Sequence, residues 1–335
     1  MSDEYLWDKS GEPAPEVRRL EAVLQALQHA ERPLDLGRAT GPVRSPRWNR
    51  TWTPVALAAA ALVVAAIVLW PRSAPMPTPW SVGSLSPGAS VNGAPANAGS
   101  GLAMGDVLET GPAARLSLRA DGVGALKLGP ASRLRVVRVD RGAHWFALDR
   151  GVLDADISAP PGAFAVETPA VRAVDLGCRY TLGVGPDGTG TLHVTLGWVA
   201  LERAGRESLV PAGAICAFRP HGGPGTPYFE GASQAFIDAL ARLDSGHADA
   251  RAGALDVALQ EARDLDGLAL WHLLTRVDGA EADRVFDRLG QFVPAPAGVT
   301  KDAVRRRDAS ALAAWWTAIG LGDLAELRAG VLRAR

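Results

Sequence analysis

The sequence predicts a multidomain membrane protein, in which a single transmembrane helix is followed by an all-β domain of solenoid or sandwich type and by an α-helical C-terminal domain. An apolar run without any charged residue covers residues 51–71. Between residues 80 and 220, short runs of alternating apolar and polar residues recur roughly every ten residues, as strands do. In residues 231–335 apolar residues recur at spacings of three and four, which is typical of amphipathic helices.

Residues 1–50 form the first predicted segment, a short arm that contains one amphipathic helix within residues 13–30. A lone helix of this length is marginal in water, so its apolar stripe needs a partner. That partner is another protein, a second copy of the chain or the membrane surface, and the mixed charge of the helix favours a protein. The residues predicted to bind the partner are Tyr5, Leu6, Trp7, Leu20, Val23, Leu24 and Leu27.

The uncharged run of residues 51–71 is long enough to cross a bilayer. As a helix, its 21 residues span about 31 Å, which matches a hydrocarbon core of about 30 Å. Trp52 and Trp70 lie near its ends, flanked by Arg50 and Arg72, and these four residues are predicted to lie at the two membrane interfaces. A buried core helix and a cleaved signal peptide are the alternatives. The first would normally carry a polar stripe, and the second would not follow fifty other residues.

Basic residues predict the orientation of this span. Arg38, Arg44, Arg47 and Arg50 precede it, whereas Arg72 is followed by no Lys or Arg until Arg115. The positive-inside rule therefore places the N-terminus in the cytoplasm. Frequent Arg and Ala with scarce Lys suggest a bacterial source, so the remaining chain is expected in the periplasm, anchored to the inner membrane. Residues 72–79 are a Pro-rich linker.

Residues 80–220 are expected to form the β domain. Period-two alternation is clearest in residues 115–119 and 133–139, and turn pairs such as Asp121-Gly122 and Asp187-Gly188 separate the runs. The chain has two cysteines, Cys178 and Cys216. An even count in an oxidising compartment favours a disulfide between them, and two separately buried thiols are the alternative.

Residues 231–335 are expected to form successive short helices. Their lengths and tight turns suggest stacked helical hairpins, and because no fixed repeat length is visible, a small irregular bundle is the alternative. Trp315 and Trp316 are adjacent, so they cannot both lie on one helix face. Either one of them is exposed for a partner, or the helix packs along both edges.

The sequence gives no sign of catalysis, so we expect no enzyme and no cofactor. Neither a nucleophile motif nor a phosphate-binding glycine motif occurs. The cysteines and histidines lack metal-ligand spacing, and His272 is expected to be a packed helix residue. Asp154 and Asp156 share one strand face, which is either solvated or a cation site. The net charge of −1, from 35 basic and 36 acidic residues, gives no electrostatic case for direct nucleic-acid binding.

Several segments in the β region carry a family resemblance. They are 105-GDVLETGPAARLSLRADGVGALKLGPASRLRV-136, 150-RGVLDADI-157, 164-FAVETPAVRAVDLGCRYTLGV-184, 197-GWVALE-202 and 211-PAGAICAF-218. In their order and spacing they resemble the FecR domain of membrane-anchored, anti-sigma-factor-type regulators. The chain departs from the family pattern "G-T-x-F" at residues 177–180, which read Gly-Cys-Arg-Tyr. It also lacks a usual FecR cytoplasmic domain.

The resemblance implies a transmembrane regulator. The domains beyond the membrane would sense an envelope protein or wall ligand, and the N-terminal arm would hold a cytoplasmic sigma factor away from RNA polymerase. The alternative is an envelope scaffold or wall-binding module with no signalling role.

Overall fold

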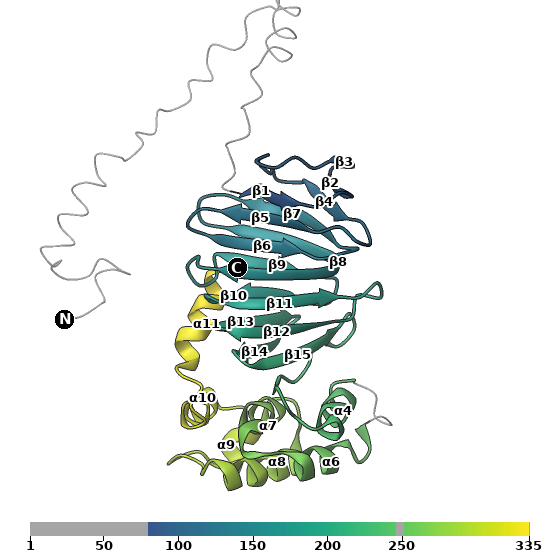
Figure 1. Ribbon diagram of the computed structural model, residues 1–335. Coiled ribbons are helices and arrows are strands. Elements are labelled where there is room, and N and C mark those ends of the chain that lie inside the picture. Colours follow the sequence, from purple (N-terminus) through teal and green to yellow (C-terminus); the bar gives the residue numbers. More distant parts are fainter. Residues whose placement is uncertain (1–79, 246–250, 335) are drawn as a thin grey trace, which may run out of the picture. The chain divides into compact units, whose positions relative to one another are not determined.

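The computed structural model describes residues 80–245 and 251–334, so the predicted arm, transmembrane span and linker lie outside the described residues. Within the described part, strands occupy residues 80–229 and helices follow from residue 234. The chain is therefore mostly β structure with C-terminal helices, as predicted (Figure 1).

The strands form two sheets that share one long strand, β8 (His144–Ile157). Sheet A contains, in spatial order, β1 (Trp80–Leu85), β5 (Leu116–Ala120), β6 (Gly124–Leu128), the second half of β8, β11 (Arg179–Val184), β12 (Gly190–Leu196) and β15 (Ala214–Arg219), the last pairing with the short strands β16 (Gly223–Pro224) and β17 (Tyr228–Phe229). All of these neighbours are antiparallel.

Sheet B contains, in spatial order, β3 (Ala94–Pro95), β2 (Ala89–Val91), β4 (Val107–Thr110), β7 (Arg133–Val139), the first half of β8, β9 (Phe164–Glu167), β10 (Arg172–Asp175), β13 (Trp198–Arg203) and β14 (Arg206–Pro211). Only the β8–β9 pair is parallel. The sheets do not close into a barrel, because each runs from one edge strand to another.

Two glycines let the chain cross from one sheet to the other. Gly151, in the middle of β8, has φ +98°, and a Cβ there would lie 2.0 Å from the Ser132 hydroxyl oxygen. Gly197, the single residue between β12 and β13, has φ +73°, and a Cβ would lie 2.0 Å from the Gly177 carbonyl oxygen. Only glycine fits these crossings. For this reason the continuous segment 190–203 forms two strands in different sheets.

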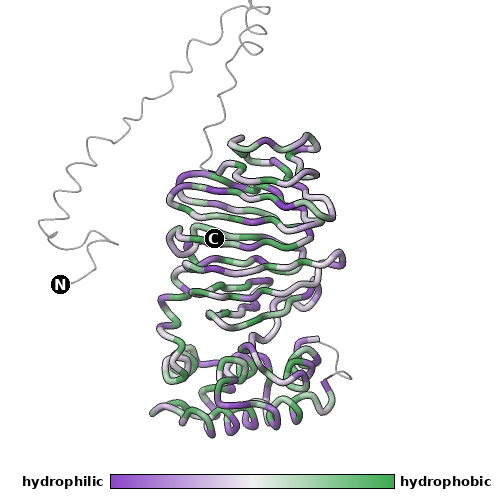
Figure 2. The backbone as a smooth tube through the Cα atoms, viewed as in Figure 1, coloured by the Kyte–Doolittle hydropathy of each residue, from purple (hydrophilic) through white to green (hydrophobic). Residues whose placement is uncertain are grey.

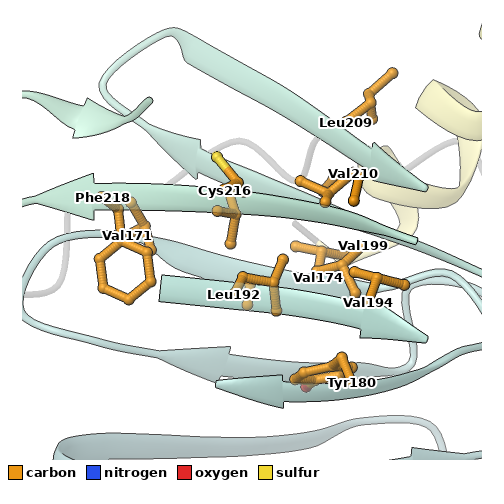
Figure 3. Packing of buried hydrophobic residues seen from close by; sticks show 14 of the residues in the cluster. Val171, Val174, Tyr180, Leu192, Val194, Val199, Leu209, Val210, Cys216 and Phe218 are labelled. Atoms are coloured by element: carbon orange, nitrogen blue, oxygen red, sulfur yellow. The ribbon is translucent and has the colours of Figure 1, made fainter. Parts of the chain in front are cut away.

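The two sheets face each other through a continuous apolar core. Apolar and polar residues alternate along strands such as β5 and β7 (Figure 2), so each of these strands turns one row of side chains inward. Strands β9, β10 and β14 are buried over most of their length. At one end of the core, Trp80 of sheet A packs edge-on against Phe146 of sheet B, with ring centroids 5.3 Å apart. Further along, Leu192 and Val194 of sheet A belong to the same buried cluster as Val199 of sheet B (Figure 3).

Helices follow the last strand: α4 (Gln234–Leu243), α6 (Ala254–Glu261), the 3₁₀ turn η2 (Asp264–Asp266), α7 (Gly267–Leu274), α8 (Gly279–Phe292), α9 (Lys301–Arg305), α10 (Ala309–Ala318) and α11 (Leu324–Arg333). Ser233, Thr300, Asp308 and Asp323 cap the N-termini of α4, α9, α10 and α11 with their side-chain oxygens. These helices agree with the successive short helices expected over residues 231–335.

Both adjacent tryptophans of α10 are completely buried, so this helix packs along both edges and presents neither ring to a partner. Trp315 packs against Phe286 of α8, with ring centroids 4.7 Å apart. Trp316 packs against Trp271 of α7 at 4.6 Å and against Trp198 of β13 at 5.6 Å. The second contact joins the helices to the β domain.

Candidate functional site

The outer edge of β14 is where the helices attach to the β domain. An open strand edge leaves backbone groups unpaired. Here His272, on α7, makes a hydrogen bond from Nε2 to the Leu209 carbonyl oxygen at 3.3 Å. Arg276, just after α7, donates from Nη2 to the Glu207 carbonyl oxygen at 3.3 Å. These two side chains therefore satisfy alternate carbonyls along the edge that β13 does not pair.

A charged cluster lies next to this edge. Arg276 donates to the Thr226 hydroxyl at 2.6 Å, the Ser208 hydroxyl at 2.6 Å and the Asp244 carboxylate at 3.2 Å. Asp244 also accepts the Thr226 backbone N–H at 2.6 Å and an ion pair from Arg206. Burial lowers the pKa of Arg276, and the charge of Asp244 opposes that shift. The cluster joins β14, the loop before β17, α4 and α7.

A basic cleft opens beside this cluster, and we treat it as the candidate functional site. One lobe, of about 660 Å³, lies between the β13–β14 turn and α11. The other, of about 530 Å³, lies between the same turn and α7 and α10. The lobes share the lining residues Gly205, Arg206, Glu207 and Arg328 and are therefore adjacent. The charged residues lining them are Arg172, Arg203, Arg206, Arg276, Arg307 and Arg328, with Glu202 and Glu207 as the acids.

Most of the cleft arginines are held in position by neighbours. Arg328 of α11 pairs with Glu207 of β14 at 3.0 Å, and Arg307 pairs with Asp278 at 3.0 Å. Arg203 donates to the carbonyl oxygens of Pro169 and Ala170 at 2.7 and 2.8 Å. The side chains of Arg307 and Arg328 are nevertheless about half exposed, so solvent and solutes reach them.

Arg172 lines the first lobe from β10. Its guanidinium lies over the Trp145 ring at 4.4 Å, a cation–π contact. It also donates from Nη2 to the Ala334 carbonyl oxygen at 2.5 Å. Together with the Arg328–Glu207 pair, this bond ties the C-terminal helix α11 to sheet B, so α11 forms a wall of the cleft.

The pKa of His272 reports the electrostatics of the cleft. Burial lowers this pKa well below 6.5, and the positive charges of Arg276, Arg328 and Arg206 lower it further. The imidazole is therefore neutral at physiological pH, and its Nε2–H donates a hydrogen bond to the Leu209 carbonyl oxygen. As expected from the sequence, His272 is a packed helix residue, only 2% exposed.

The predicted disulfide is not present: Cys178 and Cys216 are both buried free thiols. Cys216 on β15 lies opposite Leu192 of β12, and Leu192 lies opposite Leu182 of β11. Cys178 comes just before β11, so at least two strand spacings, roughly 10 Å, separate the two backbones. A disulfide needs Cα atoms about 4.4–6.8 Å apart. The alternative of two separately buried thiols is the correct one.

The cysteines have different partners. Cys178 donates its S–H to the buried carboxyl of Asp175. Burial raises the pKa of Asp175 to about 7 despite that bond and one from the Gly177 N–H. Cys216 lies 3.2 Å from the Gly225 carbonyl oxygen, and burial raises its pKa to about 12. Both thiols stay protonated, which makes them poor nucleophiles.

The two aspartates proposed for a strand face both have polar partners on the neighbouring strand β11. Asp154 accepts the Thr181 hydroxyl at 2.6 Å, and Asp156 pairs with Arg179 at 2.9 Å. All four side chains are exposed or partly exposed. This arrangement is a solvated polar sheet face.

The predicted partner-binding residues 5–7, 20, 23, 24 and 27, and the predicted interface residues 50, 52, 70 and 72, lie outside the described residues. Among residues 80–245 and 251–334, no helix has the length and apolar character needed to cross a bilayer.

The cleft itself was not anticipated from the sequence. Its arginines come from β10, β13, β14, α11 and two loops, and no local motif links these segments.

Comparison with known proteins finds similar solved structures and a matching family model. Two crystal structures, each described as a "putative anti-sigma factor" from Parabacteroides distasonis, resemble this chain at 12% and 11% identity, with TM-scores of 0.34 and 0.33. In each case the match covers 41% of this chain and 64% of the other. No curated protein matches. Residues 106–199, from just before β4 to the start of β13, match the family model described as FecR protein.

Proposed function

We propose that this chain is a single-pass membrane regulator. In this proposal, residues 51–71 anchor it in the bacterial inner membrane, the N-terminal arm binds a cytoplasmic sigma factor, and the FecR domain with its helices senses a ligand or protein in the periplasm. The FecR match over residues 106–199 carries the proposal. The order of arm, apolar run and FecR domain along the chain supports it.

A sensing role for the helices is supported by their side-chain contacts with the β domain, which go beyond the covalent link between the two parts. His272, Arg276 and Trp316 all contact β13 or β14. A ligand in the basic cleft would touch both parts at once. A differential affinity of that ligand for two states of the chain is sufficient to transmit a signal. The proposal includes no catalytic step.

The partner of the arm is tested with full-length chain purified from membranes. Leu20→Asp with Leu24→Asp adds two charges to the apolar stripe of the predicted helix. Ala22→Asp with Gln25→Asp adds the same charges to its opposite face and serves as the control. We expect a sigma factor, identified by mass spectrometry, to copurify with the wild type and the control, but not with the stripe variant.

In cells that carry the stripe variant, transcription from promoters that depend on the sigma factor should rise, because the sigma factor is no longer bound by the arm and is free to bind RNA polymerase. Cells with the wild type or the control variant should show no such rise. If no sigma factor copurifies with any of the three chains, the regulator proposal fails and the envelope-scaffold alternative is favoured.

Topology is tested separately with alkaline phosphatase fused after Arg335. Phosphatase activity supports a periplasmic C-terminus, and an inactive but stable fusion contradicts it.

A further inference from the structure

We propose that the basic cleft binds a multiply charged anion, one that carries phosphate or carboxylate groups. This inference names the ligand class for the sensing step of the proposed function and rests on it for its biological meaning. Its test measures binding to the cleft and does not involve the N-terminal arm, so the two proposals can fail separately.

The charge of the cleft lining is the first observation. Six arginines line the two lobes, against two glutamates. Asp244 and Asp278 pair with three of these arginines from outside the lining, so the arginines still outnumber the acids by two. Arginine presents a planar fork of donors that fits carboxylate and phosphate oxygens. The arginines surround the β13–β14 turn from several sides, because Arg172 lies on β10, Arg307 follows α9 and Arg328 lies on α11. A ligand with several anionic groups meets this arrangement better than a single small ion.

The second observation is unmet hydrogen bonding. The Nε atoms of Arg172 and Arg206 are buried and have no hydrogen-bond acceptor among the described residues. Buried donors are nearly always satisfied in native proteins. Both side chains line the first lobe. These Nε atoms lie beneath the surface of the lobe, so an oxyanion bound there contacts the Nη groups of the two guanidinium groups rather than Nε.

The third observation is the local field. Burial is the main cause of the lowered pKa of His272, and the positive charges of Arg276, Arg328 and Arg206 lower it further, so the second lobe disfavours an added positive charge and favours a negative one. Glu207 is the internal carboxylate at the centre of the cleft, shared by both lobes and paired with Arg328. Glu207 is therefore the counter-ion of Arg328, and an incoming anion competes with Glu207 for the Arg328 guanidinium.

The size of the cleft sets the size of the ligand. Lobes of about 660 and 530 Å³ fall in the range of pockets that hold small organic molecules. The ligand is therefore a compact polyanion or the charged part of a larger envelope molecule.

The test uses full-length chain in nanodiscs made of uncharged lipid, with titrations followed by calorimetry. The probes are inorganic pyrophosphate and citrate, with sucrose as the uncharged control, all at constant ionic strength. We expect saturable binding of pyrophosphate, citrate or both, and none of sucrose. Pyrophosphate alone identifies a phosphate ligand, and citrate alone a carboxylate ligand. No binding of either probe overturns the inference.

Variants locate the binding in the cleft. Arg328→Gln and Arg307→Gln should each weaken affinity about ten-fold, since each removes a charged donor. Arg284→Gln is the matched control, because Arg284 is a similarly exposed helix arginine that pairs with Asp256 outside the cleft. Equal weakening by all three variants would show unspecific charge attraction and would overturn the inference.

One variant should strengthen binding. Glu207→Gln removes the internal carboxylate that competes for Arg328, so affinity should rise several-fold. A gain in affinity cannot come from misfolding, which makes this the decisive variant. An unchanged or lower affinity, in a protein whose unfolding temperature matches the wild type, would mean that Glu207 does not compete with a bound anion.

Discussion

The core between the two sheets and the junction between sheet B and the helices are stabilised in different ways. In the core, aromatic and branched side chains such as Phe146 and Val194 are completely buried, and the buried acid Asp175 has a pKa raised to about 7 by burial. In the junction, Arg276 and Asp244 face each other as an ion pair with several further hydrogen bonds. The core is stabilised by buried apolar surface, and the junction is stabilised by an ion pair and by hydrogen bonds with specific geometry.

This difference indicates which part of the molecule is able to change state. Apolar packing loses stability gradually as contacts are removed, whereas a buried ion pair loses most of its value when either partner is removed. The junction is also where the basic cleft opens. A ligand that draws Arg206 or Arg328 away from its present partner acts on the attachment of the helices, while the core remains intact.

The largest expected effect belongs to the core. Phe146→Ala removes a ring that packs against Trp80 and Phe164 and should lower the free energy of unfolding by about 3–5 kcal/mol. Denaturant unfolding followed by tryptophan fluorescence measures this. Leu196→Ala is the control, because Leu196 is 57% exposed, and its change should stay below about 0.5 kcal/mol. Similar costs for both variants would contradict the core as described.

Arg276→Met should cost less, about 2–3 kcal/mol, because Asp244 keeps its bonds to Arg206 and Thr226. The effect should also be local. Hydrogen exchange should lose protection in α7 and β14 while β7 and β8 keep theirs. In a double-mutant cycle with Asp244→Leu, the combined cost should be smaller than the sum of the single costs. Additive costs, or a uniform loss of protection, would remove the distinction between core and junction.

The same division explains what sequence reading achieved. Strands such as β7 and helices such as α8 can be predicted from the sequence, because the spacing of their apolar residues along the chain has the period of a strand or of a helix. The passage of β8 through both sheets does not, because Gly151 must avoid Ser132, nineteen positions earlier. The junction depends on Arg206, Asp244 and Arg276, whose pairing arises only from tertiary packing. For the same reason the sequence did not indicate the cleft and left open whether Cys178 and Cys216 form a disulfide or two separate thiols.

The pH dependence of stability should have opposite signs in the two regions. The pKa of His272 in the junction is depressed below 6.5. Below that pH the unfolded chain binds a proton that the folded chain excludes, so acid destabilises the fold. The pKa of Asp175 in the core is raised from 3.8 to about 7. Between these values the folded chain holds the extra proton, so a rising pH destabilises the fold.

Two variants separate these contributions, each worth at most about 1.4 kcal/mol per pH unit. Relative to the wild type, His272→Gln should gain stability as pH falls from 6.5 to 5, and Asp175→Asn should gain stability as pH rises from 4 to 7. Denaturant midpoints measured across pH 4–8 give both slopes. Parallel slopes for the two variants would show that the core and the junction do not differ in this way.

The smallest expected effect concerns the cysteines. Because β12 lies between β11 and β15, the Cys178 and Cys216 thiols belong to separate packing environments, one bonded to Asp175 and the other to Gly225. A reductant should therefore leave the unfolding midpoint unchanged, and denatured, unreduced protein should titrate with two free thiols per chain. A disulfide closing this 38-residue separation would instead add about 3–4 kcal/mol that reduction removes. A midpoint that falls on reduction, or a titration that finds no thiol, would require β11 and β15 to approach far more closely than their pairing with β12 allows.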